Sequence, residues 1–234
     1  MRAKSFFLFI WLLASFSVFS QTSEYTRLHF SGSAGIDYPI GTSDTPGIDY
    51  NFTIPFLRGF AATIDGAFFF TKNYGIGLKY HLYSAKVKNE GDLLQPDVAV
   101  EYTFNENTHF ICPAIYGRWS LGNTKWSIPA NIGVGYVRNK ISNHEEKFYF
   151  SDPTITSKHF GTADMTGNSI GISVSTGICY RISPVFAIGI YTNGTFSGAK
   201  KQKTNDLLSN KPVTVDISRK MNRVGISAGL NIYY

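Results

Sequence analysis

The sequence has little of what marks helical membrane proteins, disulfide-built domains or nucleic-acid-binding proteins. After residue 20, no apolar run approaches the 18 residues of a membrane-spanning helix. The 22 Lys and Arg residues against 16 Asp and Glu residues give a formal charge of +6, which is too mild to indicate a nucleic-acid partner. Only 2 cysteines are present, Cys112 and Cys179. We expect both to be buried free thiols, although an exported compartment would permit a disulfide.

The first 20 residues have the pattern of a secretory signal peptide. Arg2 and Lys4 precede a short apolar stretch at residues 6–19, and Val18 and Ser20 suit the two small-residue positions before a cleavage site. We therefore predict export, with residues 21–234 forming a single domain. An uncleaved membrane anchor is the alternative interpretation of the same residues.

What the sequence does have is alternation. In residues 222–234 every second residue is apolar, and Gly, Ser, Asn and Arg fill most of the positions between. The same period of two occurs at 28–38, 60–70, 75–82, 125–136, 170–182 and 186–193, and less regularly at 109–121. A period of two over about ten residues is typical of an amphipathic strand, so we predict eight strands.

The irregular segment, residues 109–121, needs a separate assignment. We place Ile111, Ile115 and Trp119 on the outer face and Tyr116 and Arg118 on the inner face. Pro113 lies in the same segment and cannot donate to a strand ladder, which predicts a local irregularity there.

The connections between these segments alternate in length. Those at 71–74, 122–124 and 183–185 are short, and those at 39–57, 85–108, 138–168 and 194–220 are long. A membrane-spanning meander has short periplasmic turns and long extracellular loops. Because unpaired backbone groups cost several kcal/mol in hydrocarbon, such strands must close into a barrel.

The fold class predicted is therefore all-β: an eight-stranded antiparallel up-and-down transmembrane β-barrel with short periplasmic turns and long extracellular loops. Ten strands are the alternative, because residues 147–151 and 213–217 also have strand character.

With its signal peptide, eight segments and aromatic end, the chain resembles the small outer-membrane β-barrel proteins of the OmpA/OmpX type. SIPANIGVGY (127–136) and VGISAGLNIYY (224–234) show the likeness best. The resemblance implies a location in the cell outer membrane. It also implies that the barrel-insertion machinery reads the last strand through Val224, Ile226, Ala228, Leu230, Ile232 and Tyr234.

If the apolar faces meet lipid, the polar faces enclose the lumen. Eight strands leave a space that side chains nearly fill, and charges there must be paired or hydrated. We predict a lumen ionic network of Asp65, Lys79, Arg118, Arg181 and Arg223 that includes Asp65 with Lys79 or Arg118. A narrow conducting path is the alternative.

Two of the long loops have candidate contact residues. Lys200, Lys201 and Lys203 lie in the last loop and Arg219 and Lys220 at its end, where they could contact lipopolysaccharide phosphates, although an ordinary solvated loop would look the same. The aromatic-rich loop 138–168 is a candidate surface for an extracellular partner, although its aromatics could equally belong to strands that extend beyond the membrane.

No catalytic, cofactor or metal constellation is evident. His81 and Ser84 point to opposite faces of a strand, and His29 and Ser31 share the lumen face, away from acyl chains. His144, Glu145, Glu146 and His159 in loop 138–168 lack metal-ligand spacing.

We therefore expect a non-enzymatic, monomeric outer-membrane barrel with a structural, binding or adhesion role. One alternative is an outer-membrane enzyme acting on lipid A or phospholipid. The other is a soluble, exported, lipocalin-like barrel, which would require the apolar faces to point inward.

Overall fold

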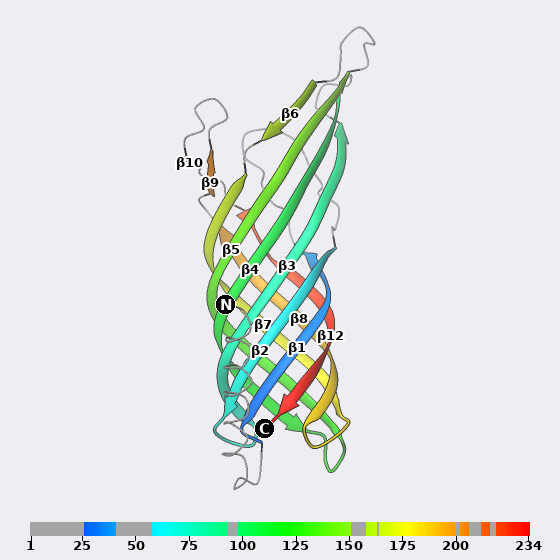
Figure 1. The fold of residues 1–234 in the computed structure, drawn as a ribbon, viewed down its shortest axis with the longest axis vertical. Helices are drawn as coiled ribbons and strands as arrows, with labels where there is room; N and C mark the ends of the chain where they lie inside the picture. Colours follow the sequence, from blue (N-terminus) through cyan, green and yellow to red (C-terminus); the bar gives the residue numbers. More distant parts are fainter. Residues whose placement is uncertain are drawn as a thin grey trace, which may run out of the picture.

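The computed structural model describes residues 26–40, 58–92, 98–150, 158–162, 164–199, 202–205, 212–215 and 219–234. Eight long strands form a barrel (Figure 1): β1 (Leu28–Pro39), β2 (Gly59–Phe69), β3 (Tyr74–Asp92), β4 (Val98–Ser120), β5 (Trp126–Phe150), β7 (Met165–Arg181), β8 (Phe186–Ala199) and β12 (Arg223–Tyr233). Four short strands lie towards its upper end: β6 (Lys158–Thr162), β9 (Gln202–Asn205), β10 (Pro212–Val215) and β11 (Arg219–Lys220). Within these ranges no helix is long and apolar enough to cross a membrane.

The barrel closes between its first and last strands. Each long strand pairs antiparallel with the next along the chain, and β12 pairs with β1 from His29 opposite Tyr233 to Pro39 opposite Arg223. The predicted eight-stranded up-and-down barrel is thus confirmed. The alternative of ten strands is wrong, because residues 147–150 continue β5 and β10 pairs with β9 outside the barrel.

The three short connections lie together at one end of the barrel, beside the C-terminus (Figure 1). Local side-chain hydrogen bonds shape these turns. The Thr71 hydroxyl accepts from the Tyr74 amide at 2.9 Å, and the Ser183 hydroxyl accepts from the Phe186 amide at 3.0 Å. Between β4 and β5, Gly122 has a φ of 59°, a left-handed conformation that glycine adopts without strain. These turns join β2 to β3, β4 to β5 and β7 to β8.

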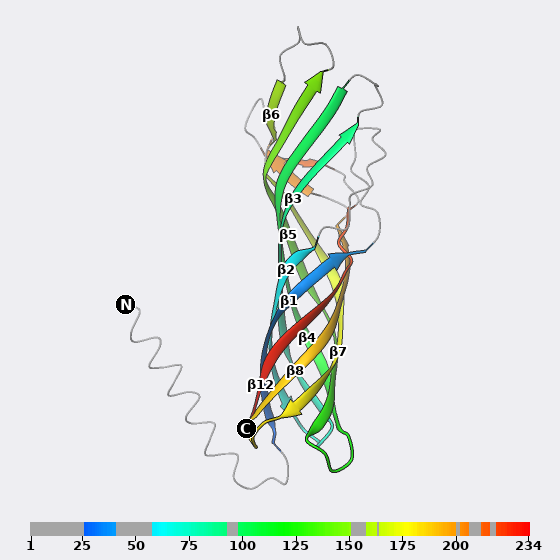
Figure 2. The ribbon, with the colours of Figure 1, turned by 90° about the vertical axis from the view of Figure 1, so that its right-hand side faces the viewer.

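The opposite end differs from the prediction. There β3, β4 and β5 continue well past the other strands (Figure 2), and their ladders reach Asp92 opposite Ala99 and Val98 opposite Phe150. The interval 85–108 is therefore mostly strand, and β5 occupies the first part of 138–168. The alternative that aromatics of loop 138–168 belong to extended strands is thus confirmed for Phe148, Tyr149 and Phe150, which lie in β5. Most of loop 39–57 lies outside the described residues.

Side chains face as the alternation predicted. Ile64, Ile170 and Ile226 are 65%, 77% and 62% exposed on the outer surface, whereas Lys79 and Asn231 are buried in the lumen. A soluble barrel of the lipocalin kind would need the reverse arrangement, so that alternative is wrong.

The assignments within residues 109–121 are also confirmed. Ile111, Ile115 and Trp119 are exposed, and Tyr116 and Arg118 are buried. The ladder between β4 and β5 is interrupted at Cys112 and Pro113 without a change of register. Both cysteines are free and buried.

Rings of aromatic side chains mark both edges of the outward apolar band. Exposed aromatics near the turns are Phe68, Phe70, Tyr74, Trp119, Trp126 and Phe186, and those at the other edge are Tyr38, Phe60, Tyr80, Tyr136 and Phe196. Aromatic rings of this kind sit at the two membrane–water interfaces of outer-membrane barrels. The extensions of β3, β4 and β5 therefore project from one interface, and the short turns lie at the other.

Candidate functional site

The turn end of the lumen is filled by cations packed on aromatic rings. The Arg118 guanidinium lies 4.4 Å from the centre of the Phe69 ring and 5.1 Å from that of Tyr233, and the Arg181 guanidinium lies 5.3 Å from the same Tyr233 ring. His29 stacks on Tyr233 with centroids 4.9 Å apart. Arg118 and Arg181 are thus held by cation–π contacts, and Arg118 also donates to the Thr26 carbonyl at 3.2 Å.

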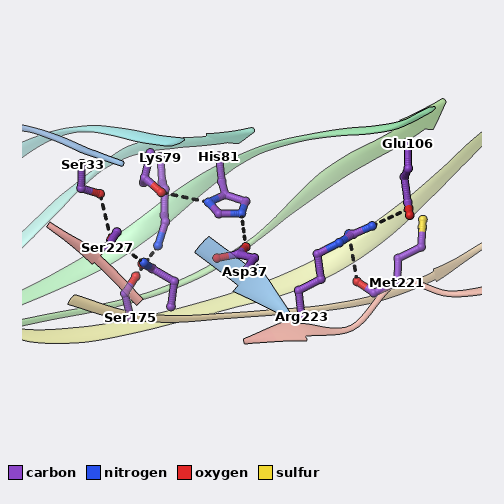
Figure 3. Close-up of polar contacts among 11 residues, drawn as sticks. Ser33, Asp37, Lys79, His81, Glu106, Ser175, Met221, Arg223 and Ser227 are labelled. Atoms are coloured by element: carbon purple, nitrogen blue, oxygen red, sulfur yellow. Dashed lines mark hydrogen bonds and ion pairs between the residues drawn. The ribbon is translucent and has the colours of Figure 1, made fainter. Parts of the chain in front are cut away.

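The middle of the lumen shows why the predicted ion pair does not form. Asp65 and Lys79 are opposite each other on β2 and β3. The Asp65 carboxylate accepts hydrogen bonds from Tyr116 at 2.9 Å and Ser31 at 3.1 Å. The Lys79 ammonium crosses the lumen to Asn131 at 3.2 Å and to Ser175, and Figure 3 shows Lys79 with Ser175. Within the described residues, the expected pairing of Asp65 with Lys79 or Arg118 is therefore absent. Neutral groups take its place, from the adjacent β1 and from β4 for Asp65, and from β5 and β7 for Lys79.

A small cavity remains at this level. Its volume is about 20 Å³, and its walls include His29, Asp65, Asn131, Ser175 and Tyr191. A cavity of this size holds about one water molecule. This cavity has no room for a small-molecule ligand.

Above it, three side chains form a hydrogen-bonded chain. The Thr63 hydroxyl lies 2.9 Å from His81 Nδ1, and His81 Nε2 lies 2.9 Å from the Asp37 carboxylate (Figure 3). The order hydroxyl, imidazole, carboxylate is that of a hydrolase triad. All three residues are at most 3% exposed, and the 20 Å³ cavity does not border Thr63 or His81. Sequence reasoning missed the chain because it depends on the register of β1, β2 and β3.

The outer end of the lumen carries a buried ion pair. Arg223 Nη2 donates to Glu106 at 2.6 Å (Figure 3). The Arg223 guanidinium also lies 4.1 Å from the centre of the Tyr83 ring. Asn139 also donates to Glu106, at 2.7 Å. Arg223 was predicted to face the lumen, and it does. Glu106 was missed because its segment was assigned to a loop.

A second feature lies on the outside of the barrel, at its outer interface. A groove of about 440 Å³ runs over β3, β4 and β5, and its walls include Tyr80, His109, Tyr136, Arg138 and Lys140. The Tyr80 hydroxyl lies 2.7 Å from His109 Nδ1, and Lys140 pairs with Asp164 at 2.9 Å. Sequence reasoning missed this groove, since Arg138 and Lys140 were counted as loop residues.

The remaining candidate residues are placed as follows. Lys203 is exposed in β9, and Arg219 and Lys220 pair with the end of β8 through β11. Lys200 and Lys201, and the side chains of His144, Glu145, Glu146 and His159, lie outside what the structure describes. Among the described residues no three His, Cys, Asp or Glu side chains gather as a metal site.

The C-terminal strand is placed at the seam of the barrel. Its apolar residues alternate along the outer face, with Ile226 62% and Leu230 57% exposed, and its edges pair with β1 and β8. Its role as a signal for the insertion machinery stays a prediction.

No family model and no curated protein matches the sequence. The outer membrane protein OprG from Pseudomonas aeruginosa matches the structure with a TM-score of 0.53 at 12% identity, covering 90% of this chain and 97% of that one. Neisserial surface protein A gives a TM-score of 0.49 at 11% identity, covering 88% and 97%. At such identity the likeness to OprG concerns the fold. The fold is that of an eight-stranded outer-membrane β-barrel of the OmpA/OmpX type.

Proposed function

We propose that this chain is a non-enzymatic, monomeric protein of the cell outer membrane, whose barrel is a solid scaffold for its outward-facing end. Export through a cleaved signal peptide of residues 1–20 and reading of the last strand by the barrel-insertion machinery belong to the proposal. The chief support is the packing of the lumen. Polar and charged side chains fill it from Arg118 at the turn end to Arg223 at the outer end.

The described lumen favours a scaffold over a pore. The cavity near Asp65 holds about one water molecule, and the Glu106–Arg223 pair stands at the outer end. The same burial argues against catalysis by Thr63, His81 and Asp37, because a substrate would have to enter this packed interior.

The outward-facing end is where contacts with other molecules would occur. The extended β3, β4 and β5, the last of which includes the first part of the predicted loop 138–168, reach beyond the other strands, which suits capture of an extracellular partner or adhesion. Lys203, Arg219 and Lys220 are placed towards the same end and remain candidates for lipopolysaccharide contacts, with Lys200 and Lys201 beside them in the sequence.

A gel of outer-membrane fractions, with and without boiling, tests the location. We expect the unboiled protein to migrate as a compact band that boiling abolishes, as closed membrane barrels do. Recovery of the folded chain in the soluble fraction, without detergent, would refute the proposal.

Two further measurements test the role. In planar bilayers the purified protein is expected to give no steady channel conductance, and lipid A mass spectra are expected to be the same with and without the gene. A stable open channel would refute the solid scaffold, and a gene-dependent change of lipid A would point to an enzyme.

A further inference from the structure

The groove on the outer wall lies where the membrane band ends. Three rows of residues cross the strands in register. Tyr80, Ile111 and Tyr136 form the first row, Leu82, His109 and Arg138 the second, and Ser84, Asn107 and Lys140 the third. Successive rows on one face are about 7 Å apart. Along the strands, the outer wall thus changes within a few residues from apolar side chains to the aromatic first row, and then to the cations Arg138 and Lys140 of the second and third rows.

The lower side of the groove is continuous with the lipid-facing surface. Ile111 and Tyr136 are 51% and 48% exposed, and below them Ile115, Ile132 and Val134 are exposed as well. A molecule in the groove could therefore lay an apolar portion on this band. A small soluble anion would make no use of it.

The upper side supplies donors for an anion. Arg138 is exposed, and among the described residues its guanidinium has no hydrogen-bond or ion-pair partner. The Tyr80 hydroxyl lies 2.7 Å from His109 Nδ1. In the tautomer in which Nδ1 accepts this hydrogen bond, Nε2 carries the proton and can donate outward. Lys140 is offset by Asp164, so Arg138 is the principal cation.

We propose that this groove binds the phosphate of an amphipathic lipid of the outer leaflet, such as the lipid A portion of lipopolysaccharide. Arg138 would bind the phosphate, with His109 and Lys140 beside it, while Tyr80, Ile111 and Tyr136 contact the adjoining acyl chains. A guanidinium presents two parallel donors to a phosphate, which a lysine cannot do. The proposal rests on the outer-membrane location proposed above and differs from the Lys200–Lys220 contacts in position and residues.

The test is a titration of the folded full-length protein in detergent with bisphosphorylated lipid A, followed by native mass spectrometry. We expect Arg138→Ala to weaken binding about fivefold, the effect of one cation near a charged membrane surface. Arg138→Lys should lose less than Arg138→Ala. Lys125→Ala removes an exposed cation from a turn at the other end and should leave binding unchanged.

Two further arms identify the ligand chemistry. Lipid A stripped of its phosphates should bind no better to the wild-type protein than to Arg138→Ala. Inorganic phosphate should not displace the lipid. Equal affinity of wild type and Arg138→Ala, undiminished binding of the stripped lipid, or displacement by inorganic phosphate would each overturn the proposal.

A heat-shift gel on each variant separates this proposal from the previous one. If Arg138→Ala folds poorly, Arg138→Gln gives the same test. If the folded variants and the wild type bind lipid A with equal affinity, only the groove proposal is refuted. If the wild-type protein gives no heat-modifiable band in membranes, the outer-membrane location is refuted, and this site is refuted with it.

Discussion

At the scale of single residues, the lumen is so crowded that some positions tolerate no side chain. A Cβ added to Gly225 would overlap the Asp37 carboxylate and lie 2.6 Å from the Ile36 carbonyl oxygen. Asp37 is the residue that holds His81. At Gly32, on the outer face of β1, an added Cβ would have no heavy atom within 4 Å, and so this glycine provides a matched comparison.

We predict that Gly225→Ala lowers the free energy of unfolding by about 1–3 kcal/mol, the usual cost of overpacking. Gly32→Ala should change it by no more than about 0.5 kcal/mol, as for most surface substitutions. Urea unfolding of the protein in lipid vesicles measures both. Equal effects of the two substitutions would show that the interior at Gly225 is not tightly packed.

The Glu106–Arg223 pair gives a second prediction at this scale. Both side chains are buried, so Glu106→Ala leaves a guanidinium without its anion and should cost about 3–5 kcal/mol. The double variant Glu106→Ala/Arg223→Ala should lose less than the sum of the two single variants, because it removes the stranded charge. The same urea titration measures all three, and strict additivity would mean that the pair is not coupled.

At the scale of the strand, the direction in which a residue faces and its depth in the membrane determine the energetic cost of a charged side chain. Leu230 lies near the middle of the outward apolar face of β12, and Val224 near its outer end. Leu230→Lys should destabilise the barrel by roughly 2–4 kcal/mol, and Val224→Lys by only about 0–1 kcal/mol, because the cost falls towards the interface. Unfolding in vesicles checks the difference. Similar costs at both positions would contradict the assigned membrane boundaries.

The strands also show how far the sequence alone could lead. Segments 28–38 and 60–70 correspond closely to β1 (Leu28–Pro39) and β2 (Gly59–Phe69), since lipid on one face and a filled lumen on the other impose alternation. The upper parts of β3, β4 and β5 were assigned to long loops, although residues 147–151 already had strand character in the sequence. The prediction therefore ended too early there, and Glu106 and the Arg138 groove were missed together.

The lumen shows a different limit. Alternation tells which residues point inward but not how far each side chain reaches across. Asp65 was predicted to pair with Lys79 or Arg118, yet Lys79 extends to Asn131 and Ser175 on β5 and β7. Contacts across a barrel depend on register and tilt, which are properties of the closed structure.

At the scale of the whole molecule, the barrel depends on the pairing of β1 with β12. This pairing joins segments almost two hundred residues apart in sequence. Ala34 and Ala228 are directly opposite each other on these strands, and both are exposed on the outer face. Cysteines at both positions are within bonding distance for a disulfide. The native Cys112 and Cys179 are buried and should not interfere.

We predict that Ala34→Cys/Ala228→Cys, folded in vesicles and treated with a mild oxidant, forms this bridge efficiently. After boiling without reductant, the circularised chain should then migrate differently from the reduced chain. Ala34→Cys/Ile232→Cys is the control, because Ile232 pairs with Phe30, four residues or about 13 Å along the strand from Ala34. Failure of the first pair, or equal bridging by both, would mean that the barrel is not closed in this register, and an open edge could not persist in a bilayer.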